Sequence, residues 1–253
     1  AVGLIRAVIC RKYGTVKDLT MEDVEPPAMD NDGVRIRVRA SGVSFAAGLV
    51  IAGKYQRKPP LPFIPGTEVA GEVIEVGNEV RDFREGDHVF ATIDWGGWAD
   101  QVIAKSFLTH PIPDGLNFAQ ATLLSLSYPT SYAALIWKAG VCDTDWVLVN
   151  GAAGAVGLAA VEIAKARGAR VIAAANTVEK RELVKAHVAD AIISYKGLRE
   201  SVKEITAGRG ANIVFDPIGG DIFMESLAAT GRGGRLITIG YASGVIPKPS
   251  LNL

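Results

Sequence analysis

The sequence has little of what several protein classes require. It holds only 2 cysteines and 3 histidines in 253 residues, too few for a disulfide framework or for a zinc site made of cysteine alone. Its 27 basic residues balance 27 acidic ones, so neither nucleic acid nor an anionic membrane surface is an expected partner. The apolar run at 156–164 is interrupted by Glu162, well short of the roughly 20 residues that span a membrane. We expect a small-molecule ligand and a reducing, cytoplasmic setting.

The pattern of apolar and turn residues changes along the chain. Short apolar runs bounded by turn residues predict strands at 35–40, 69–76 and 87–91. Asn117 and Gln120 form a capping-box pattern, and a helix is expected at 130–139. Strands and helices then alternate, which predicts an α/β fold with a doubly wound parallel sheet. The expected strands are 146–149, 170–174, 191–194, 213–215 and 235–239, and the expected helices are 154–167, 178–186, 198–206 and 222–228.

A glycine-rich turn follows the first of these parallel strands. Residues 151–157 read Gly-Ala-Ala-Gly-Ala-Val-Gly, which fits the dinucleotide fingerprint with its first glycine replaced by Ala152. Gly154 would let the backbone approach a pyrophosphate, and Gly157 would let helix pack on strand. The alternative is a turn that merely needs small residues. The expected cofactor contacts here are Ala153, Gly154, Ala155, Val156 and Gly157.

The end of the second parallel strand bears on the choice of cofactor. A site for NADH usually shows an acidic residue there, which binds the ribose 2′-hydroxyl, and this sequence has none. Asn176 and Thr177 can form hydrogen bonds, and Lys180 can neutralise a 2′-phosphate. The sequence therefore predicts NADPH. The alternative is that Lys180 and Arg181 only solvate an exposed helical face.

Several sequence blocks occur in an order that resembles a known family. They are 42–46 (Gly-Val-Ser-Phe-Ala), 65–71 (Pro-Gly-Thr-Glu-Val-Ala-Gly), 86–89 (Gly-Asp-His-Val), the glycine turn, 215–220 (Phe-Asp-Pro-Ile-Gly-Gly) and 240–244 (Gly-Tyr-Ala-Ser-Gly). The chain resembles the zinc-independent, zeta-crystallin-like quinone oxidoreductases of the medium-chain dehydrogenase/reductase superfamily. The resemblance implies a GroES-like β-barrel domain at 1–122, a Rossmann domain at 123–253 and a homodimer. Because relatives continue back into the barrel, we expect the chain to be truncated at its carboxyl end.

The resemblance also implies roles for individual residues. Tyr55 would line the substrate pocket, Thr130 would lie near the nicotinamide, and Ser44 replaces an asparagine of the family that faces the nicotinamide region. These three are the candidate catalytic residues. Tyr195 would lie near the 2′-phosphate with Lys180, and each tyrosine has a half-buried packing role as its alternative. The loop that would flank the cofactor contributes Gly240, Tyr241 and Ser243.

Zinc-containing members of the superfamily differ at two positions. Where they have cysteine and histidine ligands, this chain has Ser44 and Thr67, whose neutral hydroxyls are poor zinc ligands. We therefore expect no metal. Cys142 resembles part of a zinc motif but precedes the first parallel strand, so we expect a turn residue, and we expect Cys10 in the core. The histidines, at 88, 110 and 187, are expected to be structural.

The primary functional hypothesis is an NADPH:quinone reductase-like oxidoreductase. It would transfer a hydride to a quinone or another activated alkene or carbonyl compound, with Tyr55 orienting or protonating the acceptor. Ser44 and Ala47 depart from the family pattern, so the acceptor does not follow from the resemblance. The alternatives are a non-catalytic NADPH-binding protein acting as a redox sensor or crystallin, a 2-enoyl thioester reductase and a zinc alcohol dehydrogenase.

Overall fold

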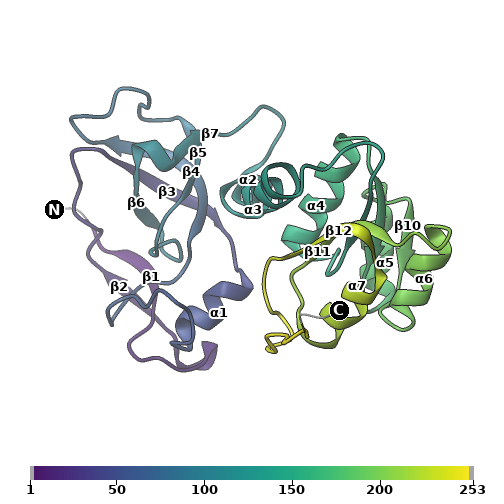
Figure 1. The fold of residues 1–253 in the computed structure, drawn as a ribbon. Helices are drawn as coiled ribbons and strands as arrows, with labels where there is room; N and C mark the ends of the chain where they lie inside the picture. The colour runs from purple at the N-terminus through teal and green to yellow at the C-terminus, as the bar shows by residue number, and fades with distance from the viewer. Residues whose placement is uncertain (1–2, 251–253) are drawn as a thin grey trace. The chain divides into compact units, whose positions relative to one another are not determined.

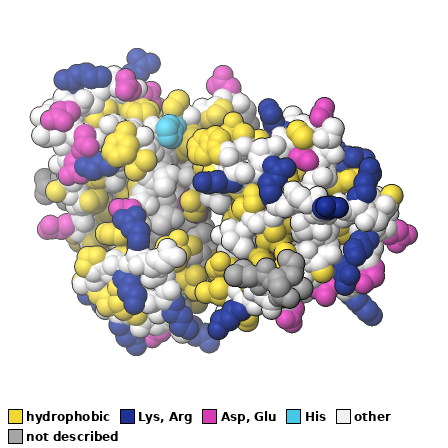
Figure 2. All heavy atoms as spheres, viewed as in Figure 1, with side chains coloured by type: hydrophobic (Ala, Val, Ile, Leu, Met, Phe, Trp, Pro, Cys, Tyr) yellow, Lys and Arg dark blue, Asp and Glu magenta, His cyan; other side chains and the backbone are white. Residues whose placement is uncertain are grey.

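The computed structural model describes residues 3–250, and the chain divides into two compact units between Leu126 and Ser127 (Figure 1). The domain boundary expected at 122/123 falls inside helix α2 (Phe118–Ser125), which belongs to the first unit. Charged side chains of both signs are mixed over the face drawn in Figure 2. In the described part of the chain, no helix is long and apolar enough to cross a membrane.

The first unit is built on antiparallel strands. Its main sheet has five strands in the order β6-β3-β4-β5-β7, and a separate pair joins β1 (Ile5–Ile9) to β2 (Thr20–Val24). Two register shifts between β3 and β4 bend the strands, and the inner face buries a cluster of mainly valine and isoleucine side chains. The predicted strands of this region are confirmed. The main sheet consists of β3 (Gly33–Ser41), β4 (Glu68–Val76), β5 (His88–Thr92), β6 (Gln101–Lys105) and β7 (Thr109–Pro111).

Short helices complete the first unit. Helix α1 (Phe45–Ile51) begins at Ser44, whose Oγ accepts a hydrogen bond from the Ala47 N–H at 3.2 Å. At α2 the predicted capping box is confirmed, because the side chains of Asn117 and Gln120 each accept the other's backbone N–H. Two 3-10 turns, η1 (Val16–Asp18) and η2 (Ser106–Leu108), lie in the connections.

The second unit holds a five-stranded parallel sheet in the order β10-β9-β8-β11-β12. Alternate side chains enter two different buried clusters: Val147 and Val149 lie in one, and Leu148 lies in the other. The sheet is therefore covered on both faces, as its apolar strands predict. All five expected strands are confirmed. They are β8 (Trp146–Val149), β9 (Arg170–Ala174), β10 (Ala191–Ile193), β11 (Ala211–Asp216) and β12 (Thr230–Thr238).

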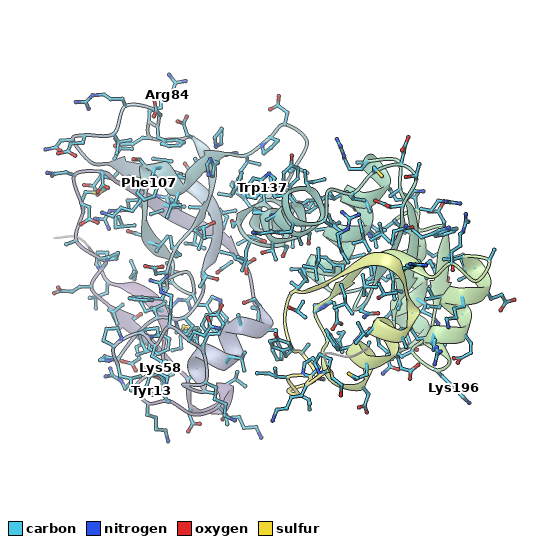
Figure 3. The ribbon with its side chains drawn as sticks, viewed as in Figure 1. Tyr13, Lys58, Arg84, Phe107, Trp137 and Lys196 are labelled. Carbon is cyan, nitrogen blue, oxygen red and sulfur yellow. The ribbon has the colours of Figure 1, made fainter. Side chains whose placement is uncertain are left out.

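The expected helices of the second unit are also present. Helices α4 and α5 contribute to the first buried cluster, whereas α6 and α7 contribute to the second. The helix expected at 130–139 starts earlier, as α3 (Ser127–Tyr132), and continues as the π-helical segment η3 (Ala133–Lys138). Trp137 on this segment is 75% exposed (Figure 3). The remaining helices are α4 (Ala155–Ala166), α5 (Val178–Lys185), α6 (Leu198–Ile205) and α7 (Gly220–Ala229).

Candidate functional site

The order of the parallel strands reverses beside β8. The chain runs outward from β8 through β9 to β10, then crosses back to β11 beside β8 and runs the other way to β12. The loops that follow β8 and β11 therefore diverge at the carboxyl ends of two neighbouring strands. Such a reversal point is where open α/β sheets bind ligands.

The glycine turn leaves β8 at this point. Gly151 has a φ of +59°, and the Gly154 N–H donates to its carbonyl oxygen at 2.9 Å. A Cβ on Gly157 would lie 2.1 Å from the same oxygen, so only glycine lets α4 pack this closely on the turn. The tight-turn conformation belongs to Gly151 rather than to Ala152, which is fully buried. The assignment of the first fingerprint position to Ala152 rests on its spacing to Gly154 and Gly157 and stays a prediction.

The amino terminus of α4 follows the glycine turn and has no side-chain cap. Gly154 is the N-cap and has no side chain to cap the free N–H groups of the first turn. Gly154 and Ala155 are exposed, and Ala153 and Val156 are half-buried. Free N–H groups and the positive end of the helix dipole favour a negatively charged group, such as a phosphate.

Tyr195, in the loop between β10 and α6, forms a hydrogen bond with the glycine turn. Its hydroxyl accepts the Gly151 N–H at 2.8 Å and donates to the Ala174 carbonyl at 3.4 Å. Burial raises the pKa of Tyr195, so the phenol keeps its proton at neutral pH and can make both bonds. This contact with the glycine turn is the position that the structure shows; a place near a 2′-phosphate stays a prediction.

The end of β9 holds a cation that sequence reasoning did not select. Arg181 donates from Nη1 to the carbonyls of Ala175 at 3.2 Å and Asn176 at 2.8 Å. Its guanidinium is thus held where β9 ends. The Thr177 hydroxyl is used locally, because it accepts the Lys180 N–H and caps α5. The sequence alone does not show which of two adjacent cations is anchored to the strand end.

The loop after β12 lies against the loop after β11. The Ala242 N–H donates to the Pro217 carbonyl at 3.0 Å, and the Ser243 N–H donates to the Ile218 carbonyl at 2.9 Å. A Cβ on Gly219, which has a φ of +73°, would lie 3.0 Å from the ring of Tyr241. The predicted cofactor-flanking residues Gly240, Tyr241 and Ser243 therefore belong to a loop fixed by backbone bonds to its neighbour.

A buried polar network, which the sequence did not predict, lies at the carboxyl ends of β8 and β11. The Asn150 side chain donates from Nδ2 to Asp216 Oδ1 at 3.1 Å and to the Ser226 hydroxyl at 2.8 Å. Asp216 also accepts the N–H groups of Ile218 and Gly219, both at 3.1 Å. The only available sequence signal was the polar residue that directly follows each of two apolar strands. These bonds tie the loop after β8 to the loop after β11.

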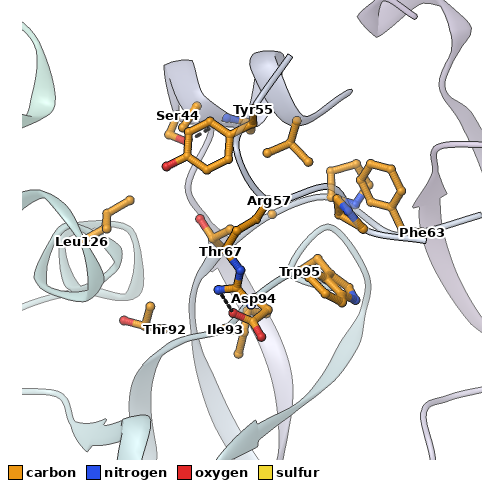
Figure 4. A pocket seen from close by; sticks show the side chains of 16 residues that line it. Ser44, Tyr55, Arg57, Phe63, Thr67, Thr92, Ile93, Asp94, Trp95 and Leu126 are labelled. Carbon is orange, nitrogen blue, oxygen red and sulfur yellow. Dashed lines mark hydrogen bonds and ion pairs between the residues drawn. The ribbon is translucent and has the colours of Figure 1, made fainter. Parts of the chain in front are cut away.

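The first unit contains a cavity of about 240 Å³. Two predicted catalytic residues, Ser44 and Tyr55, line it together, as does Thr67 (Figure 4). Tyr55 is 37% exposed, and most other lining side chains are apolar or aromatic. Thr130, the third predicted catalytic residue, lies half-buried in α3 of the second unit and does not line this cavity.

An ion pair in the same cavity was not predicted. Arg57 donates to Asp94 at 2.6 Å, and its guanidinium carbon lies 6.0 Å from the ring centroid of Trp95. These residues come from two loops that are far apart in sequence. Their pairing has no periodic or motif signal that a single sequence could reveal.

The acidic residue beside Thr67 is buried in β4. Glu68 is 5% exposed, and burial raises the pKa of its carboxyl group. Within residues 3–250, no three His, Cys, Asp or Glu residues gather as a metal site would require. Cys10 lies in the core as predicted, and Cys142 lies in the loop before β8, where its N–H donates to Asp145.

The three histidines have packing or hydrogen-bonding partners. His88 packs on Phe118 with ring centroids 4.9 Å apart, and His110 packs similarly on Phe90 at 5.4 Å. His187 Nδ1 lies 2.7 Å from a carboxylate oxygen of Glu162. These contacts agree with the structural roles expected for all three.

Comparisons with known proteins match both units. Residues 30–114 match the family model of the alcohol dehydrogenase GroES-like domain, and residues 155–253 match that of the zinc-binding dehydrogenases. The quinone oxidoreductase-like protein 2 homolog of Nematostella vectensis is 40% identical over 253 residues, 98% of this chain and 68% of that protein. Human quinone oxidoreductase is 33% identical over 242 residues, 94% of this chain and 73% of that protein.

Solved structures show the same fold. Escherichia coli quinone oxidoreductase, whose crystal structure is complexed with NADPH, matches with a TM-score of 0.90 at 28% identity. The match covers 98% of this chain and 76% of that one. The predicted combination of a GroES-like domain with a Rossmann-type parallel sheet is thereby confirmed.

Proposed function

Because the chain belongs to the quinone oxidoreductase family of the medium-chain dehydrogenase/reductase superfamily, we propose that it reduces a small conjugated acceptor with NADPH. The acceptor would be a quinone or another activated alkene or carbonyl compound. Catalysis would proceed without zinc.

One observation carries the cofactor part of this proposal. At the reversal point of the sheet, Gly157 leaves no room for a Cβ beside the Gly151 carbonyl, and the first turn of α4 presents free N–H groups. This cradle suits the pyrophosphate of a dinucleotide. The E. coli relative that is complexed with NADPH has the same fold, which supports the same cofactor here.

The end of β9 supports NADPH over NADH. The Arg181 guanidinium is anchored there by two carbonyl oxygens through Nη1, which leaves its remaining donors for a ligand. Guanidinium groups bind phosphate oxygens in pairs. We propose that Arg181 and Lys180 hold the 2′-phosphate, with Asn176 and Thr177 forming the rest of that subsite.

The cavity of the first unit supports the acceptor part. Its apolar and aromatic lining with few polar groups is typical of small-molecule pockets and suits a flat, weakly polar ring. When bound, NADPH supplies the hydride. Tyr55 would donate a hydrogen bond to the acceptor's carbonyl oxygen, and Ser44 and Thr67 would offer further hydroxyls. The proton that completes the two-electron reduction comes from Tyr55 or from solvent.

The donor set around Thr67 supports catalysis without zinc. Zinc sites use thiolate, imidazole or carboxylate ligands, and Ser44 and Thr67 provide neutral hydroxyls in the cavity. Glu68 is the one carboxylate beside Thr67, and a single carboxylate provides fewer protein ligands than the three of a catalytic zinc site. Metal analysis of the purified protein should find no stoichiometric zinc.

The decisive experiment follows the loss of NADPH absorbance with naphthoquinones, alkenals and enoyl thioesters as acceptors. We expect turnover with at least one quinone and a weaker response with NADH. Turnover with enoyl thioesters alone would identify a 2-enoyl thioester reductase. Tight NADPH binding without turnover on any acceptor would contradict the proposal and favour a non-catalytic NADPH-binding protein.

The assembly and location also remain part of this proposal. We propose a homodimer, which the resemblance to the family implies, and a reducing, cytoplasmic setting, which the two cysteines of the sequence favour. Light scattering of the purified protein tests the dimer, and fractionation of the source cells tests the location.

A further inference from the structure

A depression in the second unit lies at the amino-terminal ends of the parallel strands, whereas the glycine turn lies at their carboxyl ends. It has a volume of about 610 Å³ and is lined from the first residues of β8, β9 and β12 and from Asn212 near the start of β11. Those four strands are neighbours in the sheet. Because these strands are parallel, their amino ends lie together at one end of the sheet. A ligand bound there would not overlap a dinucleotide bound at the carboxyl ends.

The depression is strongly basic. Arg170, Lys203, Arg209 and Arg232 line it, and no lining residue is acidic. In the described part of the chain, none of the four has an ion pair with a carboxylate. This local excess contrasts with a chain whose 27 basic and 27 acidic residues balance.

Capping of helix ends explains only part of this charge. Helices α6 and α7 end at this edge, and Lys203 lies in the last turn of α6. The Arg209 Nε donates to the Thr206 carbonyl just beyond α6. Each helix carboxyl end carries roughly half a negative charge, so two ends offset about one of the four positive charges. A net excess of about three positive charges remains without a partner.

Trp146 and Asn212 line the depression beside Arg170. The Arg170 guanidinium carbon lies 4.5 Å from the ring centroid of Trp146, which holds this arginine in place by a cation–π contact. The Trp146 Nε1 is buried and has no acceptor among the described residues. Asn212 accepts the Trp146 backbone N–H with its Oδ1 at 2.8 Å, which leaves its Nδ2 group free to donate.

We propose that this depression binds a small anion with at least two linked phosphate groups, such as pyrophosphate or the phosphates of a nucleoside polyphosphate. Two phosphate groups carry about three negative charges at neutral pH, which matches the unpartnered positive charge. Arginine binds phosphate oxygens in pairs. The volume lies within the range of small-molecule sites.

Calorimetric titration of the whole chain with pyrophosphate tests the proposal. The variant Arg209→Gln with Arg232→Gln removes two exposed cations from the depression. The control, Arg84→Gln with Arg199→Gln, removes two exposed cations elsewhere and changes the net charge equally. We expect pyrophosphate affinity to fall roughly tenfold or more in the first variant, because charge-assisted bonds are lost, and to stay unchanged in the control.

Binding of pyrophosphate at the glycine turn contributes equally in both variants, so the difference between them isolates the depression. Equal affinities in the two variants, or no binding by the wild type, would overturn the proposal. If Arg209→Gln with Arg232→Gln does not fold, Lys203→Gln with Arg232→Gln serves instead. Titrations with ATP and with inorganic phosphate show whether a nucleotide or free phosphate is the ligand. Binding of a single-stranded RNA without binding of pyrophosphate would also overturn the proposal.

Discussion

The two units build their candidate sites from different parts of the chain. In the second unit the candidate cofactor site at the reversal point is made by backbone: a glycine turn, the first N–H groups of α4, and two loops joined by N–H to carbonyl bonds. In the first unit the cavity is made by side chains from separate loops, such as Tyr55 and Asp94. A backbone site tolerates no added atoms, whereas a side-chain site can be retuned one residue at a time. This difference predicts how sensitive each unit is to substitution.

Gly157→Ala should have the largest effect. The new Cβ would lie 2.1 Å from the Gly151 carbonyl oxygen, which is backbone and cannot rotate away. We expect NADPH affinity to fall by about a hundredfold or more, with a loss of about 1–3 kcal/mol in the free energy of unfolding. Fluorescence titration and thermal unfolding measure the two effects.

Gly48→Ala in α1 is the matched control for Gly157→Ala. A Cβ there meets nothing within 4 Å, and alanine favours a helix interior over glycine by roughly 0.5–1 kcal/mol. NADPH affinity should be unchanged. If Gly157→Ala binds NADPH as the wild type does, the glycine turn is not the cofactor site, and the contrast between the units fails.

Arg181→Gln should have the next largest effect on NADPH affinity. It tests the one part of the cofactor site that we assign to charged side chains. Losing a charge-assisted bond to a phosphate costs about 1.5–3 kcal/mol, so NADPH affinity should fall roughly tenfold or more. NADH affinity should stay the same. Lys180→Gln should have a smaller effect on NADPH, because the structure shows no anchor for its side chain.

Arg199→Gln, on the exposed face of α6, controls for the general loss of one positive charge. Affinity should not change in this variant. Equal losses for NADPH and NADH in Arg181→Gln would show that the arginine only maintains the end of β9 and does not read the 2′-phosphate.

Tyr55→Phe addresses the side-chain site. Removing one neutral hydrogen-bond donor costs about 0.5–1.5 kcal/mol, so we expect kcat with a quinone to fall roughly threefold to tenfold while the KM for NADPH stays constant. Tyr13→Phe is the control, since its hydroxyl donates to the Pro59 carbonyl at 2.7 Å and Tyr13 does not line the cavity. If the two variants lose the same activity, Tyr55 has a packing role.

The same contrast explains what the sequence could predict. The parallel strands, the capping box at Asn117 and the glycine turn follow from local patterns of apolar residues, caps and glycine, which act over a few positions. Even there, only the structure shows that Gly151 takes the positive φ of the turn. The pairing of Arg57 with Asp94 and the basic depression bring together residues that are far apart in sequence. A single sequence has no periodicity that encodes such contacts.

The smallest expected effect is a change in the pH dependence of stability. It follows from the difference between two buried carboxyl groups, one in each unit. Asp216 accepts three hydrogen bonds, from Asn150, Ile218 and Gly219. Glu68 has no hydrogen-bond donor to its carboxyl group among the described residues, and burial raises its pKa. A carboxyl group whose pKa is higher in the folded than in the unfolded state stabilises the fold below its unfolded value. That contribution is lost as the pH rises through the folded value.

Glu68→Gln removes this titration while keeping the shape of the side chain. The melting temperature of the variant should therefore rise relative to that of the wild type as the pH increases from about 4 to about 8. The difference should be roughly 2–4 °C for each kcal/mol in the free energy of unfolding. Glu79→Gln, an exposed residue beyond the same strand, should follow the wild type at every pH. If Glu68→Gln instead loses stability as the pH rises, the ionised carboxylate has a stabilising partner, and both units satisfy their buried acids in the same way.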